Sequence, residues 1–468
     1  MTNLVSDGDR DIFVANYQAD GTLAWARRFG GPRADSLSQG GVKLDASGKI
    51  YVVCDFSGTV TFGGDPTFGD LGTFTFTADS TTDHVVLRFD ASGKLEWATW
   101  FGGAFADGFA LNDSGSIYVA GQFDGTRQFG HQQLTAISNG RDSLDGFLSR
   151  LDAETGQFVW TTKTGGKGSE WFNDIVFDAG SGSLYLTGGY TGQAVIGSTT
   201  LKANNLNSKG FVAKADQAGN FLWAKSLDGG GTGHCAAMVD GNVVVAGFFE
   251  DTATFGNIRL TNSQPGPDLF LASLQSDGKV NWAVSAAGVG SGRTEIYPRA
   301  ITADASGNLF VAGNFRDQYD GTASAQFGAD LLVSSGNSDL FVSQVNGASG
   351  QFLKSWRMGG TSGDEFASSL TVDAAGNLWM DGSFAGMADF PNGETQTSVN
   401  NSRDIFLLKF LQSPPTATAT APASLQTTAS ADKPARNSAV FLDATAVQQL
   451  CAEPERTWTF KSRVRMRV

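Results

Sequence analysis

The sequence is poor in cysteine, proline and histidine, and these shortages exclude several classes of protein. It has three cysteines, eleven prolines and three histidines. Cys54, Cys235 and Cys451 are odd in number and widely spaced and form no CxxC pair, so neither a disulfide framework nor a thiolate zinc site is expected. Three scattered histidines make no His-rich metal site. We therefore expect no cofactor, and a fold that depends on core packing.

Positive charge and long apolar runs are also scarce. Lysine and arginine number 33 against 47 aspartates and glutamates, a formal net charge of −14 that would repel a phosphate backbone. No stretch approaches the roughly 18 apolar residues of a membrane span. Residues 1–17 lack the basic segment and apolar run of an export signal. We therefore expect no nucleic-acid partner, no membrane span and no signal peptide in this chain.

Glycine and aromatic residues are abundant, and they recur in a repeat. The 60 glycines, 35 phenylalanines and ten tryptophans are typical of short strands joined by tight turns. A segment with the pattern D-x-F-V, followed by G-x-L-x-W-A, starts at Asp11, Asp83, Asp145, Lys209, Asp268 and Asp339, with a partial copy at Asp404. Its tryptophans, Trp25, Trp97, Trp160, Trp223, Trp282 and Trp356, lie 59 to 74 residues apart.

A second strand, with the pattern Y-V-x-G-x-F, lies between these copies. We expect its glycine to allow close approach of a neighbouring backbone; the glycines are Gly121, Gly188, Gly247, Gly313 and Gly382. With a strand after each Gly-Gly turn, one unit has four strands, as in a β-propeller blade. A single four-stranded sheet cannot bury both its faces, so neighbouring blades must stack in a ring.

These units predict an all-β fold, a β-propeller of four-stranded antiparallel blades over residues 1–411. The chain supplies six copies of the first, second and fourth strands and seven of the third. Six blades are favoured, with the N-terminal strands completing the last one, and a seventh incomplete blade is the alternative. Residues 412–438 are a Pro/Ala/Thr/Ser-rich linker with the composition of a disordered tail. Residues 439–468 are a basic stub of unknown structure that matches no propeller strand.

The unit resembles a known bacterial repeat. The pattern D-x-F-V-x-K-x-D-x-x-G-x-L-x-W-A, with D-x-x-G-N-x-Y-V-x-G-x-F, is nearly whole across 209–230 and 296–315. It is similar to the β-propeller repeat called the SBBP repeat over about residues 5–411. The resemblance implies a secreted or cell-envelope protein without an assigned enzymatic role, in a family commonly described with seven blades. Locally, Asp152 to Trp160 is similar to the tryptophan-docking motif of quinoprotein propellers, which we interpret as shared packing.

The candidate site is a set of polar residues five positions past the first glycine of each Gly-Gly turn. If the first strands line the channel, these side chains form a ring at one mouth. Converging carboxylates repel, so the ring would need a cation, such as calcium, or raised pKa values. The alternative is that each acid accepts backbone N–H bonds in its own turn. The predicted ring comprises Asp35, Asp107, Glu170, His234, Glu295 and Asp364.

Other motifs favour structural roles. Asp7, Asp9 and Asp11 open like an EF-hand loop but have no glycine at the sixth place, so Asp11 and its repeat equivalents are interpreted as strand-entry caps. No helical pattern follows the glycine clusters, which are therefore turns rather than phosphate loops. A Ser-His-Asp triad stays open, since triads are recognised by geometry. Cys54 and Cys235 are expected to be core residues.

Two functions remain open. The first is a non-enzymatic, monomeric interaction or structural module of the cell surface or secretome. It would bind protein or glycan through the connections in which the units differ, namely 63–82, 130–144, 197–208, 256–267 and 316–338. The alternative is a propeller enzyme of quinoprotein or lyase type with its active site at the channel mouth. An enzyme should show polar side chains that depart from the repeat at one mouth.

Overall fold

The computed structural model describes residue 4, residues 465–467 and most of residues 11–411. The gaps within that span are 19–21, 71, 80–81, 113, 138–143, 204–207, 228–230, 263, 291, 320, 362–364, 374, 392 and 399–402. The described residues form strands and turns and contain no helix, and so none that could cross a membrane.

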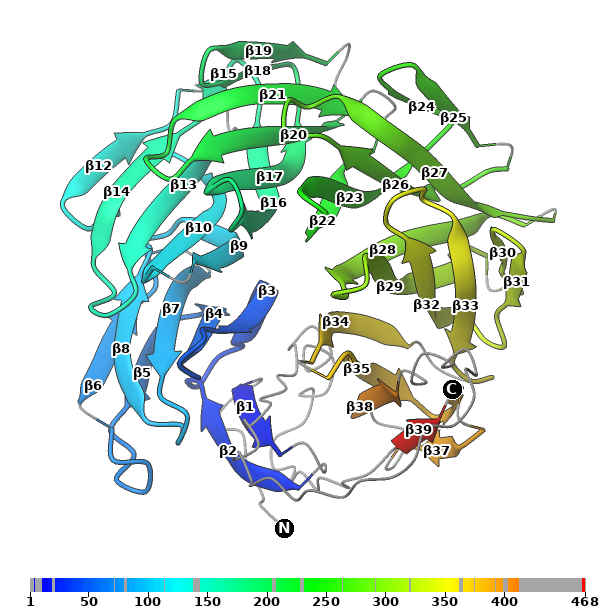
Figure 1. The fold of residues 1–468 in the computed structure, drawn as a ribbon. Coiled ribbons are helices and arrows are strands. Elements are labelled where there is room, and N and C mark those ends of the chain that lie inside the picture. Colours follow the sequence, from blue (N-terminus) through cyan, green and yellow to red (C-terminus); the bar gives the residue numbers. More distant parts are fainter. Residues whose placement is uncertain are drawn as a thin grey trace, which may run out of the picture.

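Six groups of four strands follow one another around a ring (Figure 1). Within each group the strands pair in chain order, and in all but the last group the pairing is antiparallel throughout. The groups are β3 (Ser36–Leu44), β4 (Ile50–Phe56), β7 (Asp83–Phe89) and β8 (Leu95–Trp100); β9 (Phe105–Asn112), β10 (Ser116–Phe123), β13 (Asp145–Asp152) and β14 (Phe158–Lys163); β16 (Glu170–Asp178), β17 (Ser183–Tyr190), β20 (Lys209–Asp216) and β21 (Phe221–Leu227); β22 (Gly233–Val239), β23 (Asn242–Phe249), β26 (Asp268–Leu274) and β27 (Val280–Gly288); β28 (Thr294–Ala303), β29 (Asn308–Asp317), β32 (Ser338–Asn346) and β33 (Phe352–Met358); and β34 (Phe366–Val372), β35 (Leu378–Ala385), β38 (Arg403–Leu411) and β39 (Arg465–Arg467). The predicted all-β propeller is confirmed.

The connections between second and third strands are hairpins rather than loops. Four of their first strands carry the recurring phenylalanines Phe62, Phe129, Phe255 and Phe327, which are buried and anchor those hairpins to their blades. The hairpins are β5 (Thr59–Gly63) with β6 (Thr73–Thr77), β11 (Thr126–Phe129) with β12 (Gln132–Thr135), β18 (Gln193–Ile196) with β19 (Thr199–Lys202), β24 (Thr252–Phe255) with β25 (Ile258–Thr261), β30 (Ser324–Phe327) with β31 (Asp330–Val333), and β36 (Met387–Asp389) with β37 (Thr395–Thr397). Two of them also tie blades together, because β30 pairs with β27 and β18 with β15 (Gly165–Gly166).

The N-terminal strands do not complete the last blade as we predicted. β1 (Ile12–Tyr17) and β2 (Leu23–Phe29) form a two-stranded sheet of their own, and β38 pairs instead with β39 in parallel. Ile405 and Leu407 of β38 pack against the core cluster that contains β1, so the two sheets meet face to face. β39 belongs to the C-terminal stub, which we expected to match no propeller strand, and that expectation is wrong for these three residues.

The second-strand glycine lies against a bulge in the first strand. In the second to sixth blades, one extra residue of the first strand bulges out opposite this glycine. A Cβ on Gly121 would lie 1.8 Å from the Phe105 carbonyl oxygen, and one on Gly188 would lie 2.0 Å from that of Trp171. The predicted close approach is therefore confirmed. In the first blade Cys54 replaces the glycine, and the irregularity is longer, between Leu37 and Val42.

The repeated tryptophans join each blade to the next. The indole N–H of Trp97 donates to the carbonyl oxygen of Ala153 in the following blade at 3.1 Å, and Trp282 donates to Gly347 at 2.9 Å. The rings also cover turn glycines with positive φ, as Trp97 covers Gly156 at +70°. Trp25 of β2 docks onto Ala91 in the same way at 3.0 Å, so β1 and β2 occupy the outer half of a blade position. The ring of Trp160, in the local motif, also covers a turn glycine, Gly219, but its indole N–H has no hydrogen-bond partner among the described residues.

Candidate functional site

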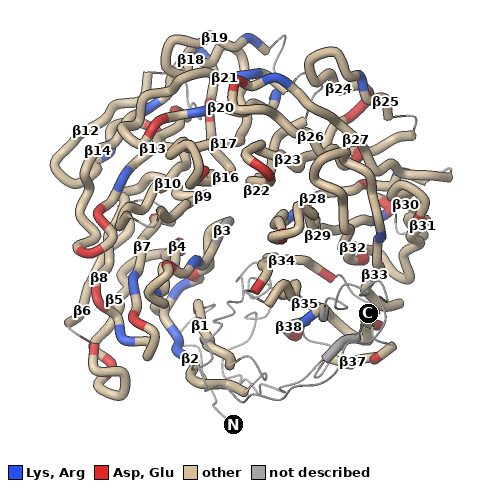
Figure 2. The backbone as a smooth tube through the Cα atoms, in the orientation of Figure 1, with Lys and Arg blue, Asp and Glu red and all other residues tan. Residues whose placement is uncertain are grey.

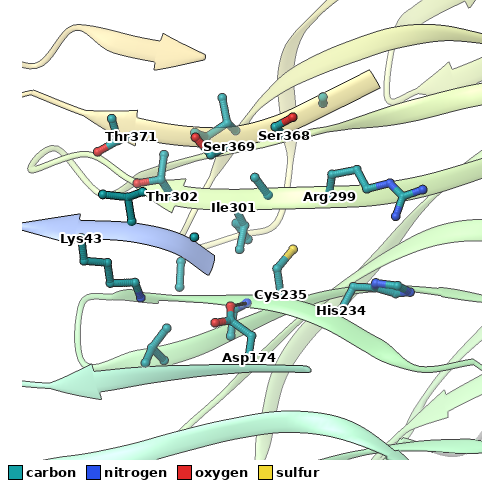
Figure 3. Close-up of a pocket in the computed structure, with 18 of the residues that line it drawn as sticks. Lys43, Asp174, His234, Cys235, Arg299, Ile301, Thr302, Ser368, Ser369 and Thr371 are labelled. Atoms are coloured by element: carbon teal, nitrogen blue, oxygen red, sulfur yellow. Dashed lines mark hydrogen bonds between the residues drawn. The ribbon is translucent and has the colours of Figure 1, made fainter. Parts of the chain in front are cut away.

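A cavity of about 840 Å³ lies within the ring, lined by the first strands of the six four-stranded groups described above. This volume is within the usual range for small-molecule sites, roughly 300–1,000 Å³. Acidic and basic residues are distributed around the whole ring (Figure 2). Inside the cavity charge is sparse, and among the described residues it is limited to Lys43 on β3, Asp174 on β16, Arg299 on β28 and Asp381 on β35. Figure 3 labels the first three of these residues.

The first-strand bulges present side chains to this cavity. The bulged residues of four successive blades, Asn173, His234, Arg299 and Ser368, all line it. A bulge re-aims a side chain and interrupts regular pairing, which is why bulges are frequent beside functional sites. Because the four residue types differ, the cavity departs from the repeat where the core does not.

The predicted ring of six is not placed together in the cavity lining. Of its members only His234 lines the cavity, while Asp35, Asp107, Glu170 and Glu295 do not. Asp364 lies outside the described residues. Counting five positions from each Gly-Gly turn does not select structurally equivalent residues. Asp107 and His234 are bulged residues, whereas Glu170 is the first residue of its strand. Among the described residues no group of three or more His, Cys, Asp or Glu is placed to hold a metal ion.

Two members of the predicted ring have local partners. The carboxylate of Asp35 accepts the Gly31 N–H at 2.7 Å and the Ser57 N–H at 3.0 Å, as the turn alternative proposed. Burial nevertheless raises the pKa of Asp35 to about 7. Glu295 pairs with Arg316 at 2.8 Å.

The other two acids are more weakly compensated. Burial raises the pKa of Asp107 to about 7, against a lowering hydrogen bond with Gln122. Burial, with the nearby negative charge of Asp145, raises the pKa of Glu170 to about 8, while Lys163 lowers it. Neither carboxylate oxygen of Glu170 has a hydrogen-bond partner among the described residues.

The strand-entry aspartates act as caps. The Asp83 carboxylate accepts the Asp79 N–H at 2.9 Å, and Asp145 accepts that of Ile137 at 2.8 Å. Asp339 accepts the Ser335 N–H at 3.0 Å. The predicted cap is confirmed for these three members of the series.

Lys43 and Asp174 face each other across the cavity. They come from different blades, and Figure 3 shows them pointing toward one another. Burial lowers the pKa of Lys43, which the negative charge of Asp174 counters, and burial raises the pKa of Asp174, which Lys43 counters. The Asp174 carboxylate accepts the N–H of Ile175 at 2.8 Å and of Ala236 at 2.9 Å, the second from the next blade. Lys43 Nζ lies 5.1 Å from the centre of the Phe109 ring.

His234 and Cys235 carry little reactivity in this setting. Burial, with the nearby positive charge of Arg299, lowers the pKa of His234 to about 4, so its imidazole is neutral at pH 7. Burial raises the pKa of the Cys235 thiol well above its usual value, which suppresses the nucleophilic thiolate. Cys54 and Cys235 are both buried free thiols, as predicted.

A serine–histidine contact occurs outside the cavity lining. Ser38 Oγ lies 2.9 Å from Nδ1 of His84, and the same nitrogen is 3.2 Å from the carbonyl oxygen of Ala106. Both side chains are buried, and burial lowers the pKa of His84 to about 4. This pair links β3 to β7, which lie on either side of β4 in the same sheet, and offers no accessible nucleophile.

The sequence carried a signal for one cavity residue that we did not use. The residue before the second-strand glycine is Ala120, Ala246 or Ala312 in three blades but Asp381 in the last. Asp381 accepts the Ser369 N–H at 2.9 Å and the Ser369 hydroxyl, which joins two cavity strands. The sequence gives no comparable signal for Lys43 and Asp174. The first strands vary too much between units to be aligned unless the positions of the bulges are known.

Comparison with known proteins gives few matches in sequence. No family model matches the chain. The regulatory protein FlaEY of Caulobacter vibrioides is 25% identical over an alignment of 197 residues, which covers 39% of this chain and 19% of that protein. The match thus spans about a fifth of the length of the curated relative.

Several solved structures align with most of the chain at low similarity. BamB from Moraxella catarrhalis has a TM-score of 0.37 and 15% identity, covering 81% of this chain and 95% of that one. The quinohemoprotein alcohol dehydrogenase of Comamonas testosteroni has a TM-score of 0.36 and 10% identity, covering 82% and 74%. XC5397 of Xanthomonas campestris, a gluconolactonase, has a TM-score of 0.34 and 14% identity, covering 82% and 94%. At these values the likenesses carry no argument about function.

Proposed function

We propose that this chain is a non-enzymatic binding module that holds a small polar ligand in the central cavity. One observation carries the proposal: His234 Nδ1 and Ser368 Oγ are buried polar atoms without a partner among the described residues, and both residues are bulged into the cavity lining. A buried polar group left unpaired costs about 1–3 kcal/mol. A ligand that bonds these atoms would recover that cost.

The chemistry of the lining supports binding rather than catalysis. Among its described residues no serine or cysteine is hydrogen-bonded to a histidine, as a nucleophile and base would be. The pKa of His234, about 4, is far from the value near neutrality that suits a general base.

The projecting hairpins are the places where a protein or glycan would contact the ring. Their exposed residues differ between blades, with Leu331 and Val333 on β31 where β12 has Gln133 and Thr135. The SBBP-like repeat supports an envelope or extracellular location, which fractionation of cells carrying the epitope-tagged full-length protein would test. A cytoplasmic pool alone would contradict that location.

The proposed function is tested by filling the cavity. Ala300→Phe places a ring in the cavity lining, and Gln133→Phe adds the same ring on an exposed hairpin position as control. We expect small polar compounds from a defined library to raise the melting temperature of the wild type and of Gln133→Phe but not of Ala300→Phe. Thr302→Phe, also in the lining, replaces Ala300→Phe if that variant does not fold.

The fate of the ligand separates binding from catalysis. We expect mass spectrometry to recover the bound compound unchanged after prolonged incubation. Turnover that Ala300→Phe abolishes would support the enzyme alternative instead. Equal ligand response in the wild type and both cavity variants would place binding outside the cavity and overturn the proposal.

A further inference from the structure

We propose that the cavity takes a small zwitterion, its carboxylate bound by Lys43 and its ammonium by Asp174. This inference rests on the proposed function and names its ligand class. The two side chains come from β3 and β16 and point toward one another in the cavity (Figure 3).

The Lys43 ammonium has no hydrogen bond or ion pair with any described residue, whereas its backbone pairs with Tyr51 of β4. Its recorded contacts are the ring of Phe109 beneath the ammonium and the longer-range attraction of Asp174. A lysine ammonium has three donors, and a charge held away from water is costly unless it is paired. Lys43 therefore offers a carboxylate a positive charge with all its donors available.

Backbone hydrogen bonds fix the position of the Asp174 carboxylate, but no ion pair with a described residue balances its charge. Two backbone N–H groups hold its oxygens, one from its own strand and one from Ala236 of the next blade. An ionised carboxylate has about four acceptor sites, so roughly two stay open. Although Asp174 and Lys43 influence each other's ionisation, no ion pair joins them in the described part of the chain. Two opposite charges thus face the same space without contact.

The remaining charges of the cavity are engaged elsewhere. Asp381 bonds the backbone N–H and hydroxyl of Ser369. Arg299 sits at an exposed bulge and has interactions of its own. With two positive and two negative residues the lining is close to electroneutral, so a ligand of zero net charge with separated charges fits better than a simple anion or cation.

The test uses a series of ω-amino acids whose two charges lie at increasing separation. Glycine, β-alanine, γ-aminobutyrate and 6-aminohexanoate are titrated into the full-length protein by calorimetry, beside butyrate and butylamine, which each carry one charge. We expect at least one amino acid to bind tenfold or more tightly than both single-charge compounds. An optimum in chain length would report the distance between the two sites.

Three variants test which side chain binds which charged group of the ligand. We expect Lys43→Met and Asp174→Asn each to reduce zwitterion affinity at least tenfold, while Lys225→Met, at an exposed lysine of β21, leaves it unchanged. Circular dichroism and the melting temperature confirm folding. If Lys43→Met does not fold, the comparison of amino acid with butyrate and butylamine on the wild type decides alone.

Distinct results overturn this inference and the proposed function. Butyrate binding as tightly as the amino acids would replace the zwitterion with an anion and overturn the inference, as would failure of the whole series. If another compound then stabilises the wild type but not Ala300→Phe, the proposed function stands without it. If no compound of any class does so, both fall.

Discussion

At the scale of single residues, the second-strand glycine is the most constrained position. It faces a backbone carbonyl, so a side chain has no direction in which to relax. In a bulge this contact cannot be removed without re-pairing the strand. The residue therefore sets both the blade geometry and the direction of the cavity-lining side chains.

Gly247→Ala is expected to destabilise the protein by about 2–4 kcal/mol. Its Cβ would lie 2.3 Å from the Thr232 carbonyl oxygen and 2.6 Å from the Phe270 ring. Gly72→Ala is the matched control, because its Cβ would meet no atom within 4 Å and its φ is not positive. Urea unfolding measures both variants. A Gly247→Ala protein as stable as the control would show that the strands are not held this closely.

At the scale of strands and blades, tryptophan docking is the recurrent contact between neighbours. Five of the six rings, all but that of Trp356, cover a turn glycine of the next unit, and four of them donate the indole N–H to a carbonyl there. These contacts join blades that share few backbone hydrogen bonds. They explain why the tryptophan recurs although the strand around it varies.

Trp97→Phe is expected to lower the free energy of unfolding by about 1–3 kcal/mol, because the carbonyl oxygen of Ala153 loses its donor and the ring loses volume. Thermal or urea unfolding measures the loss. Leu222→Ala, at a side chain that is 53% exposed on β21, is the control and should change stability by less than about 0.5 kcal/mol. A loss no larger than the control's would count against blade docking as a source of stability.

At the scale of the whole molecule, several buried carboxylates share one pH dependence. The pKa values of Asp35 and Asp107 are about 7 and that of Glu170 is about 8, all raised by burial. The folded state therefore holds protons near neutral pH that the unfolded state has released. The stability that these protons contribute is lost as pH rises through the folded-state values.

The free energy of unfolding is expected to fall by roughly 1–2 kcal/mol between pH 7 and pH 9. Histidines contribute little in this window, because His84 and His234 have pKa values of about 4 when folded and ordinary values when unfolded. Glu170→Gln should flatten the slope, whereas Glu250→Gln, at an exposed site, should not. Denaturant unfolding at several pH values measures this, and a stability that rises toward pH 9 would contradict it.

Much of the architecture was accessible from the sequence because it is repeated. The aromatic strands, the turn glycines and the tryptophans recur in register, so one interpretation applied to every unit. The positions of the predicted site residues could not be inferred from the repeat in the same way, and of the described ones only His234 lines the cavity. The six residues were aligned by distance from a turn, and a one-residue bulge changes which side chain enters the cavity.

The sequence alone determined the propeller, because no single blade can bury both of its aromatic faces and ring packing is the remaining solution. It also determined the bulge glycines and the strand-entry caps, which depend on contacts within a unit or between neighbours. Only the tertiary structure decided which side chains meet in the centre. Lys43 and Asp174 lie 131 positions apart in the numbering and belong to different blades, and their approach depends on strand register and ring geometry, which leave no local pattern in the chain.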